Sequence, residues 1–177
     1  MILEKLFGKR DTKGCAAFLA EARPGDSLDL DRQTWRVAAM HRYIWEEPPG
    51  EQLVWELRRQ EDLCLLTKTS SDEVVLGRVT SLEKLDPTLV LHILEHDDPP
   101  EQLNLENQDY HLEASLAGAY HEQGQTRGSD LVAWTYFGQD RHYRLLIEQR
   151  GGKTFLCTLG KIIGPGQLTN LQHLAKP

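Results

Sequence analysis

Residues 28–37 read LDLDRQTWRV, and residues 103–112, 75 positions later, read LNLENQDYHL. The two stretches share leucines at their first and third positions, glutamine at the sixth and an aromatic residue at the eighth. The similarity extends without a gap over residues 11–45 and 86–120. It resumes at VVLGRV (74–79) and CTLGKI (157–162). This pattern predicts an internally duplicated chain whose two units pack about a pseudo-twofold axis.

The chain divides naturally at the start of the second copy. We predict an N-terminal tail at residues 1–10, a first unit at 11–85 and a second unit at 86–177. A unit of about 80 residues with a one-sided sheet gains much of its core by pairing with the other unit. We therefore expect the two units to form a single compact domain.

Each unit begins with a predicted helix. In the first unit Asp11 is the expected N-cap, and Pro24 and Gly25 end the segment. In the second unit Asp86 is the expected N-cap, with Pro87 at the first helical position, where its fixed φ and missing N–H cost nothing. A short third helix is predicted from Thr169 to Ala175.

Alternation of apolar and polar residues predicts antiparallel strands after each helix. Gly151-Gly152 is typical of a two-residue hairpin turn, since both positions require positive φ. The predicted fold class is mainly β (α+β): two helix-plus-sheet units packed as a sandwich or a partly closed barrel, with the helices at ends or edges. The predicted strands are 35–45, 53–59, 63–68 and 73–80 in the first unit, and 110–120, 131–137, 142–149 and 153–163 in the second.

Composition narrows the choice of partners and compartment. The net charge is −7, from 20 Lys and Arg against 27 Asp and Glu. A nucleic-acid partner is not expected, because binding phosphates requires a basic surface. Cys15, Cys64 and Cys157 are odd in number and widely spaced, which favours buried thiols in a reducing compartment.

Membrane association is predicted to be weak at most. No apolar run reaches the roughly 20 residues that span a bilayer, and the N-terminus lacks the pattern of a signal peptide. We therefore expect a cytoplasmic protein. Residues 2–10 are amphipathic, and we expect them to dock on their own domain, with a weak membrane-surface contact as the alternative.

Aromatic and apolar strand residues carry a resemblance to a known family. Over about residues 24–168 the chain resembles an uncharacterised bacterial domain of unknown function with the pattern W-x-V … W-x-E-x-L … L-G-x-x-I. One departure is Cys64-Leu65, where the family pattern has Trp-Leu. The residues that carry the resemblance are Trp35, Val37, Tyr43, Trp45, Trp55, Glu56 and Leu57, then Leu146, Ile147, Glu148 and residues 158–163.

The resemblance implies a cytoplasmic accessory role. Genes of that family occur near those for phage-shock-like membrane-stress proteins and for homologues of polyamine-synthesis enzymes. The family supplies no catalytic residues, so it implies no reaction.

One motif matches a metal-binding signature. His92, Glu95 and His96 form H-x-x-E-H, in which the histidines lie one helical turn apart and the glutamate serves as base in inverted zinc peptidases. That signature also needs a third, acidic ligand from another helix, and the first unit has no matching residues. We expect solvated histidines here and keep a zinc-dependent hydrolase as an alternative.

An aromatic and acidic cluster suggests a second kind of site. Indole faces beside carboxylates suit an organic cation such as a polyamine, through cation–π contact and charge pairing. The competing interpretation places the two tryptophans in the core, because large aromatics on an alternating face are usually buried. The cluster consists of Tyr43, Trp45, Glu47, Trp55 and Glu56.

No set of residues predicts nucleophilic catalysis. The chain contains no G-x-S-x-G, no P-loop and no cysteine in an activating context. We expect a non-enzymatic module without a cofactor. The leading hypothesis is that it binds a protein partner through edge strands or the groove between the units. A polyamine binder and a zinc hydrolase are the alternatives, and the oligomeric state stays open.

Overall fold

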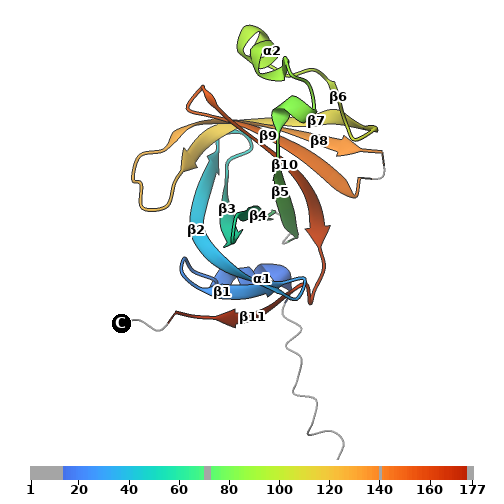
Figure 1. Cartoon of the computed structure of the whole chain (residues 1–177). Helices are drawn as coiled ribbons and strands as arrows, with labels where there is room; N and C mark the ends of the chain where they lie inside the picture. The colour runs from blue at the N-terminus through green and yellow to red at the C-terminus, as the bar shows by residue number, and fades with distance from the viewer. Residues whose placement is uncertain (1–13, 70–72, 140, 175–177) are drawn as a thin grey trace, which may run out of the picture.

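The computed structural model describes residues 14–69, 73–139 and 141–174. They form a mainly β protein: an antiparallel sheet of 11 strands with two short α-helices (Figure 1). The predicted fold class is thereby confirmed in its coarse form. No helix among the described residues is long and apolar enough to cross a membrane.

The first half of the chain contributes one helix and five strands. Each predicted strand occurs within three residues of its expected bounds, and β1 was not predicted. The elements are α1 (Cys15–Glu21), β1 (Ser27–Leu30), β2 (Gln33–Trp45), β3 (Gly50–Arg59), β4 (Asp62–Lys68) and β5 (Val74–Thr80).

The second half repeats this order and adds a final strand. It begins with a 3-10 turn, η2, before its helix. The elements are η2 (Leu82–Lys84), α2 (Leu89–His96), β6 (Gln102–Leu105), β7 (Gln108–His121), β8 (Ser129–Gly138), β9 (Tyr143–Arg150), β10 (Thr154–Ile163) and β11 (Leu168–Gln172).

Eight of the strands close into a partial ring. Their order is β2-β3-β4-β5-β10-β9-β8-β7, and residues 42–45 of β2 return to pair with residues 118–121 of β7. This closing contact depends on Gly118, because a Cβ there would lie 2.2 Å from the carbonyl oxygen of Ile44. Beyond the ring, β1 and β11 extend the sheet from β2, and β6 extends it from β7.

The two quoted stretches form hairpins. In β1–β2 the turn residues Asp31 and Arg32 have φ of 51° and 66°, and in β6–β7 Glu106 and Asn107 have φ of 53° and 64°. Positive φ at both turn positions matches the right-handed twist of the flanking strands. The predicted turn at Gly151-Gly152 has positive φ at both glycines, 56° and 75°, but its connection has three residues instead of two, because Arg150 pairs with Thr154.

Three apolar cores occupy the two faces of the sheet. One lies inside the ring, where Tyr43, Val54, Leu65 and Leu131 pack together from different strands. The other two lie outside it. One packs α1, β1 and β11 against β2–β5, and the other packs α2 and β6 against β7–β10. Figure 1 shows α1 and α2 at opposite outer surfaces of the ring.

Several sequence predictions need correction, and others fall outside the described residues. The helix predicted from Thr169 to Ala175 is wrong, because residues 168–172 form β11 and pair with β1. The helices were expected at ends or edges of the sheets. They instead cover outer faces of the ring, because the strands are buried on both of their faces. Helix α2 starts at Leu89, and Asp86 instead accepts hydrogen bonds from the backbone N and Oγ1 of Thr88. The predicted cap Asp11 and the tail 1–10 are outside the described residues.

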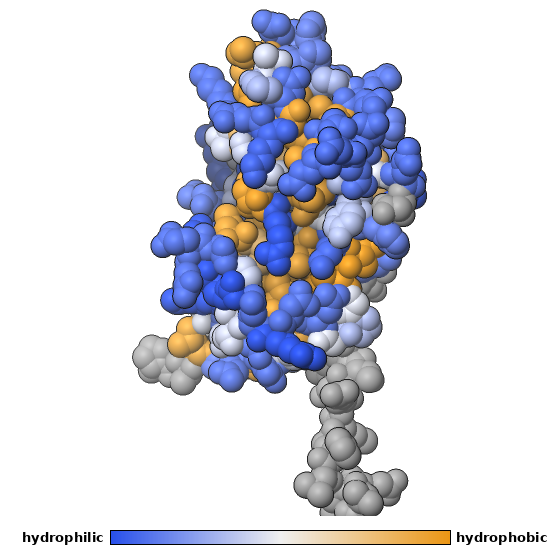
Figure 2. All heavy atoms as spheres, turned by 45° about the vertical axis from the view of Figure 1, so that its right-hand side comes forward, coloured by the Kyte–Doolittle hydropathy of each residue, from blue (hydrophilic) through white to orange (hydrophobic). Residues whose placement is uncertain are grey.

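The surface is largely polar. On the face toward the viewer in Figure 2, hydrophobic side chains show mainly in a band across the middle of the molecule, between more polar upper and lower parts.

Candidate functional site

The inner face of the ring carries most of the buried polar groups. Strand pairing directs alternate residues inward, so β2 contributes His41, Tyr43 and Trp45. On β9 the inward-pointing residues include Glu148 and Arg150, because the pairing of β9 with β8 and β10 places them on the same face of the sheet. Polar side chains of strands far apart in sequence therefore meet inside the ring.

One polar group ties β2 to β9. The hydroxyl of Tyr43 donates to the Glu148 carboxylate, with distances of 2.8 and 2.9 Å to its two oxygens, and accepts from Arg150 at 2.6 Å. Arg150 Nε also donates to Glu148 at 3.0 Å. Burial, together with the Glu148 charge, raises the pKa of Tyr43 well above its ordinary value. The tyrosine is therefore a fixed neutral donor.

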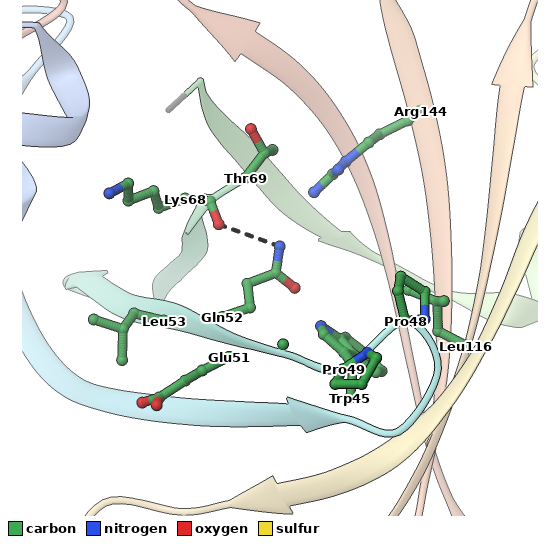
Figure 3. Close-up of a pocket in the computed structure, with 11 residues that line it drawn as sticks. Trp45, Pro48, Pro49, Glu51, Gln52, Leu53, Lys68, Thr69, Leu116 and Arg144 are labelled. Atoms are coloured by element: carbon green, nitrogen blue, oxygen red, sulfur yellow. Dashed lines mark hydrogen bonds between the residues drawn. The ribbon is translucent and has the colours of Figure 1, made fainter. Parts of the chain in front are cut away.

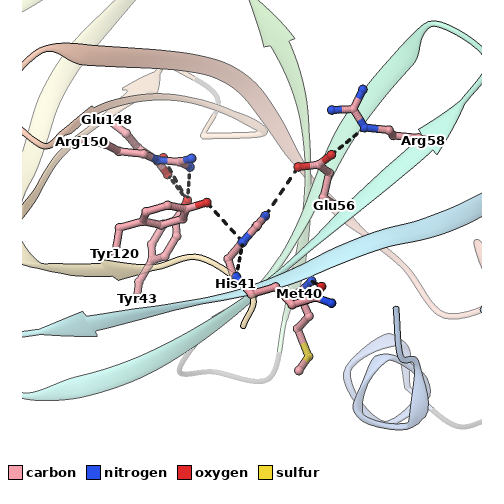
Figure 4. A network of polar contacts seen from close by, with 9 residues as sticks. Met40, His41, Tyr43, Glu56, Arg58, Tyr120, Glu148 and Arg150 are labelled. Carbon is pink, nitrogen blue, oxygen red and sulfur yellow. Dashed lines mark hydrogen bonds and ion pairs between the residues drawn. The ribbon is translucent and has the colours of Figure 1, made fainter. Parts of the chain in front are cut away.

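A second polar group centres on His41, which sequence reasoning missed. Its Nδ1 accepts from the backbone N of Gln123 at 3.3 Å and lies 3.2 Å from the hydroxyl of Tyr120. Its Nε2 lies 3.5 Å from Glu56, which also pairs with Arg58 at 2.7 Å (Figure 4). Since Nδ1 receives a backbone N–H, the proton of the neutral ring belongs on Nε2, facing Glu56.

The two groups form one network. The guanidinium carbon of Arg150 lies 4.1 Å from the ring centroid of Tyr120, within cation–π range. Tyr43 and Glu148 are each 2% exposed, and His41 is 6% exposed. Because these groups are buried and satisfy one another, the network holds the strands in place and fills one end of the ring (Figure 4).

The opposite end of the ring holds a pocket of about 580 Å³. It lies at the β2–β3 turn, where Trp45 ends β2, and Leu116 of β7 faces it from across the ring closure. Trp45 packs edge-on against Tyr43, with ring centroids 5.6 Å apart and planes at 87°. The apolar wall consists of Trp45, Pro48, Pro49, Leu53 and Leu116.

The polar wall of the pocket contains both charge signs. Gln52 donates to the carbonyl of Lys68 at 3.2 Å, which fixes its amide at the pocket edge. Glu51 is exposed and lies 3.8 Å from Arg42. Figure 3 shows Arg144 extending from β9 toward Gln52 and Thr69.

Arg144 is the second important residue that the sequence did not reveal. It is half-buried, and among the described residues it makes no hydrogen bond or ion pair. Burial lowers its pKa from the ordinary value, while the charges of Glu148 and Glu73 act in the opposite direction. An arginine side chain nevertheless stays charged at neutral pH.

The predicted cation cluster is not gathered in one place. Trp45 lines the pocket, whereas Trp55 is buried in the outer core with its Nε1 3.3 Å from the carbonyl of Ala22. Tyr43 and Glu56 belong to the internal network. Glu47 is exposed in the β2–β3 turn. Neighbouring positions on a strand point to opposite faces, which separates Trp55 from Glu56.

The H-x-x-E-H residues lie at the end of α2, outside the ring. The rings of His92 and His96 are 4.5 Å apart; His92 is partly buried, whereas Glu95 and His96 are exposed. No group of three or more His, Cys, Asp or Glu side chains in the described part of the chain is placed to hold a metal ion. The third ligand required by that signature is therefore missing from the described neighbourhood.

The three cysteines are all buried and unpaired. Burial raises the pKa of Cys64 and of Cys157 to about 12. Cys15 donates to the carbonyl of Gly164 at 3.0 Å. Since the thiolate is the reactive form, these thiols are structural.

A family comparison places the chain in a known family. The model of the Domain of unknown function (DUF4178) matches residues 23–165, so the chain belongs to this family of domains of unknown function. Comparisons with curated proteins and with solved structures found no match.

Proposed function

We propose that this protein is a non-enzymatic binding module that takes one small ligand into the pocket at the open end of its ring. The observation that carries the proposal is the pocket itself, with its volume of about 580 Å³. Ligand pockets in proteins commonly measure about 300–1,000 Å³ and combine an apolar wall with a few polar groups. An eight-stranded barrel is also the size that encloses side chains or a single small ligand.

The two ends of the ring support this assignment. At one end the network of His41, Tyr43, Tyr120, Glu148 and Arg150 pairs its polar groups with one another. At the other end the polar groups around Gln52 and Arg144 border open space. A ligand entering at the open end would meet a preformed wall and a closed floor.

An internal duplication accounts for this architecture, and we propose it as the origin of the fold. Strands β2 and β7 each carry a register shift, at Val37/Ala39 and at Leu112/Ala114. The hairpins β1–β2 and β6–β7 also carry similar side-chain hydrogen bonds. Thr34 Oγ1 donates to the carboxylate of Asp29 at 2.7 Å, and Asn104 Nδ2 donates to that of Asp109 at 2.8 Å.

The strand pairing suggests a small change to the sequence alignment of the two halves. The residue pairs can be traced strand by strand, from β2 to β5 in the first half and from β7 to β10 in the second. By this pairing Val75 and Leu156 occupy equivalent positions. The sequence similarity instead matches Gly77 with Gly160, a difference of two residues in the last strand. The two glycines lie opposite each other in the β5–β10 pairing.

A neutral aromatic probe tests the proposed function. N-phenyl-1-naphthylamine, which fluoresces in apolar surroundings, is expected to bind saturably to the parent protein. Leu116→Trp should abolish this binding by filling the pocket, whereas the matched Leu94→Trp on the exposed face of α2 should not. Absence of saturable binding to the parent, or equal loss in both variants, would reject the proposal.

A protein partner is the second candidate function. It is favoured by α2, on which Leu91 and Leu94 are 62% and 50% exposed while Leu89 and Ile93 are buried. An amphipathic helix with apolar residues on both sides suits a contact with another protein. Purification of the tagged parent beside a Leu91→Gln, Leu94→Gln variant should show a partner that only the parent retains.

A further inference from the structure

We infer that the ligand of this pocket carries an anionic group, such as a carboxylate, phosphate or sulfonate, and that Arg144 binds it. The inference rests on the proposed function, because it concerns the same pocket. It names the charge of the ligand, which is opposite to that of the polyamine suggested by sequence.

The first argument is the electrostatic state of Arg144. A half-buried guanidinium has lost part of its hydration, and among the described residues no oxygen accepts a hydrogen bond from its N–H groups in return. The charges of Glu148 and Glu73 favour the guanidinium but make no hydrogen bond with it, so an anion that accepts from its N–H groups would lower the remaining cost of burial. Five N–H donors in a planar fork suit a carboxylate or phosphate held by two parallel hydrogen bonds.

The second argument is the space provided for the arginine. Arg144 pairs with Gly160 of β10, and a Cβ at Gly160 would lie 3.4 Å from Arg144 Cγ and 2.8 Å from Val75 Cγ1. The missing side chain therefore allows the arginine stem to cross β10 on the inner face. The guanidinium then reaches the mouth of the pocket, as Figure 3 shows.

The third argument is the charge around the pocket. Arg144 and Lys68 both line it, and Glu51 is the acidic lining residue. Glu51 lies at the exposed rim and already faces Arg42 at 3.8 Å. The half-buried charged residues of the lining, Arg144 and Lys68, are both positive. Glu148 and Glu73, whose charges act on Arg144, are not lining residues. This lining favours an anion over an organic cation.

The apolar wall indicates what else the ligand contains. Trp45 is held edge-on by Tyr43 and presents an indole beside Pro48 and Pro49. Such a wall suits a flat, apolar group attached to the anion. A free inorganic ion would leave this wall in contact with water, so we expect an organic anion.

A matched pair of probes tests the inference. 8-Anilinonaphthalene-1-sulfonate has the same aromatic body as N-phenyl-1-naphthylamine and adds a sulfonate. In the parent protein we expect the sulfonate probe to bind about 10-fold more tightly, the gain of one charge-assisted contact. Arg144→Gln should remove this difference, with the affinity of the neutral probe measured in the same variant as the reference. The control Arg141→Gln, at an exposed arginine paired with Glu113, should preserve it.

The outcomes separate the inference from the proposed function. If both probes bind the parent equally, the pocket stands as a binding site and the anion inference fails. If neither probe binds, the proposed function fails and the inference with it. Should Arg144→Gln not fold, the affinity ratio of the two probes is measured against ionic strength. A ratio that stays constant as salt rises would overturn the inference, because a contact between charges weakens with screening.

Discussion

At the scale of single residues, the buried carboxylate of Glu148 is the group that depends most on its hydrogen-bond and ion-pair partners. It is 2% exposed, and its charge is matched by Arg150 and by the hydroxyl of Tyr43. Removing one partner of such a group leaves the other without solvent or a counter-charge. Glu148 therefore stabilises the fold only as long as the whole group is intact.

Substitutions in this group should differ in cost. Glu148→Gln leaves the Arg150 charge unpaired and should lower the free energy of unfolding by about 3 kcal/mol. Tyr43→Phe leaves the ion pair in place and should cost about 1 kcal/mol. Urea denaturation measures both. The control Glu113→Gln, at an exposed ion pair, should cost less than about 1 kcal/mol, and an equal cost for Glu148→Gln would contradict this account.

The buried thiols give a second prediction. Because the pKa values of Cys64 and Cys157 are raised to about 12, both stay protonated at pH 8. A thiol-specific reagent such as dithionitrobenzoate should therefore react slowly with the native protein and with all three cysteines in denaturant. Rapid native labelling of Cys64 or Cys157, located by peptide mapping, is the result that would disagree.

The sequence concealed the polar residues of the site for a physical reason. In β9, Arg144, Glu148 and Arg150 alternate with Leu145 and Ile147, a pattern that predicts one apolar face and one solvent face. The structure covers both faces, so the charged positions point into the ring. In β2, His41 alternates with Tyr43 and Trp45 along the strand. This alternation is the sequence pattern that would have placed His41 on the same face as the two aromatic residues.

At the scale of elements, the long strands were predictable and the short ones were not. Alternation over β2 or β8 extends for many residues, whereas β1 and β6 are four residues each and end in turns without glycine. In β11 the residues Leu168 and Leu171 fit a helix as well as a strand, and its pairing with β1 decides the outcome. Pairing between residues distant in sequence therefore decides whether a short segment forms a strand or a helix when its local pattern fits both.

Closure of the ring depends on β2 and β7 approaching closely at Gly118. The Cβ introduced by Gly118→Ala would lie 2.2 Å from Ile44 O and 3.0 Å from Trp45 Cα, both backbone atoms that cannot move aside cheaply. We expect a loss of about 2 kcal/mol or more in the free energy of unfolding. Gly124→Ala, in the β7–β8 loop, is a weaker control because its φ is 78° although nothing lies near its Cβ. Amide exchange at residues 42–45 should rise in Gly118→Ala alone, and unchanged exchange there would argue against this role.

The C-terminal segment is held to β1 by Asp26. This carboxylate accepts from the backbone N of Arg23 at 2.8 Å and of Leu174 at 3.2 Å, and lies 3.0 Å from His173 Nδ1. Burial alone would raise the pKa of Asp26, but these hydrogen bonds outweigh it and the pKa is lowered.

A lowered folded-state pKa fixes the direction of the pH dependence. The stabilisation by Asp26 is complete above the unfolded pKa of about 3.9 and is lost as the pH falls through the lower folded value. Asp26→Asn should therefore cost about 2 kcal/mol at pH 5–7, and this difference should shrink below about pH 4. Thermal unfolding of both proteins across this range measures it, and a difference that grows at acidic pH would reverse the assignment.

At the scale of the whole molecule, the two halves cannot complete their cores alone. They meet at two seams of the ring, β2–β7 and β5–β10, and both seams are lost when the chain is divided. Residues 163–171 of the second half also pack into the outer core of the first, through Ile163, Leu168 and Leu171. The inner core takes Tyr43 and Val54 from one half and Leu131 from the other. Each half would thus expose strand edges and apolar surface that the intact chain buries.

This interdependence predicts one cooperative unfolding transition. The full chain should give coincident urea curves by far-ultraviolet circular dichroism and by tryptophan fluorescence, because the three cores share their strands. In Trp134→Phe the remaining fluorescence comes from tryptophans 35, 45 and 55 of the first half, and it should still follow the dichroism of the whole chain. Residues 11–85 and 86–177 produced separately should lack the sharp amide spectrum of a folded monomer. A stable monomeric half, or separate transitions in the full chain, would mean that a half of the chain carries a sufficient core by itself. Neither the ring seams nor the crossing of β11 would then be needed for folding.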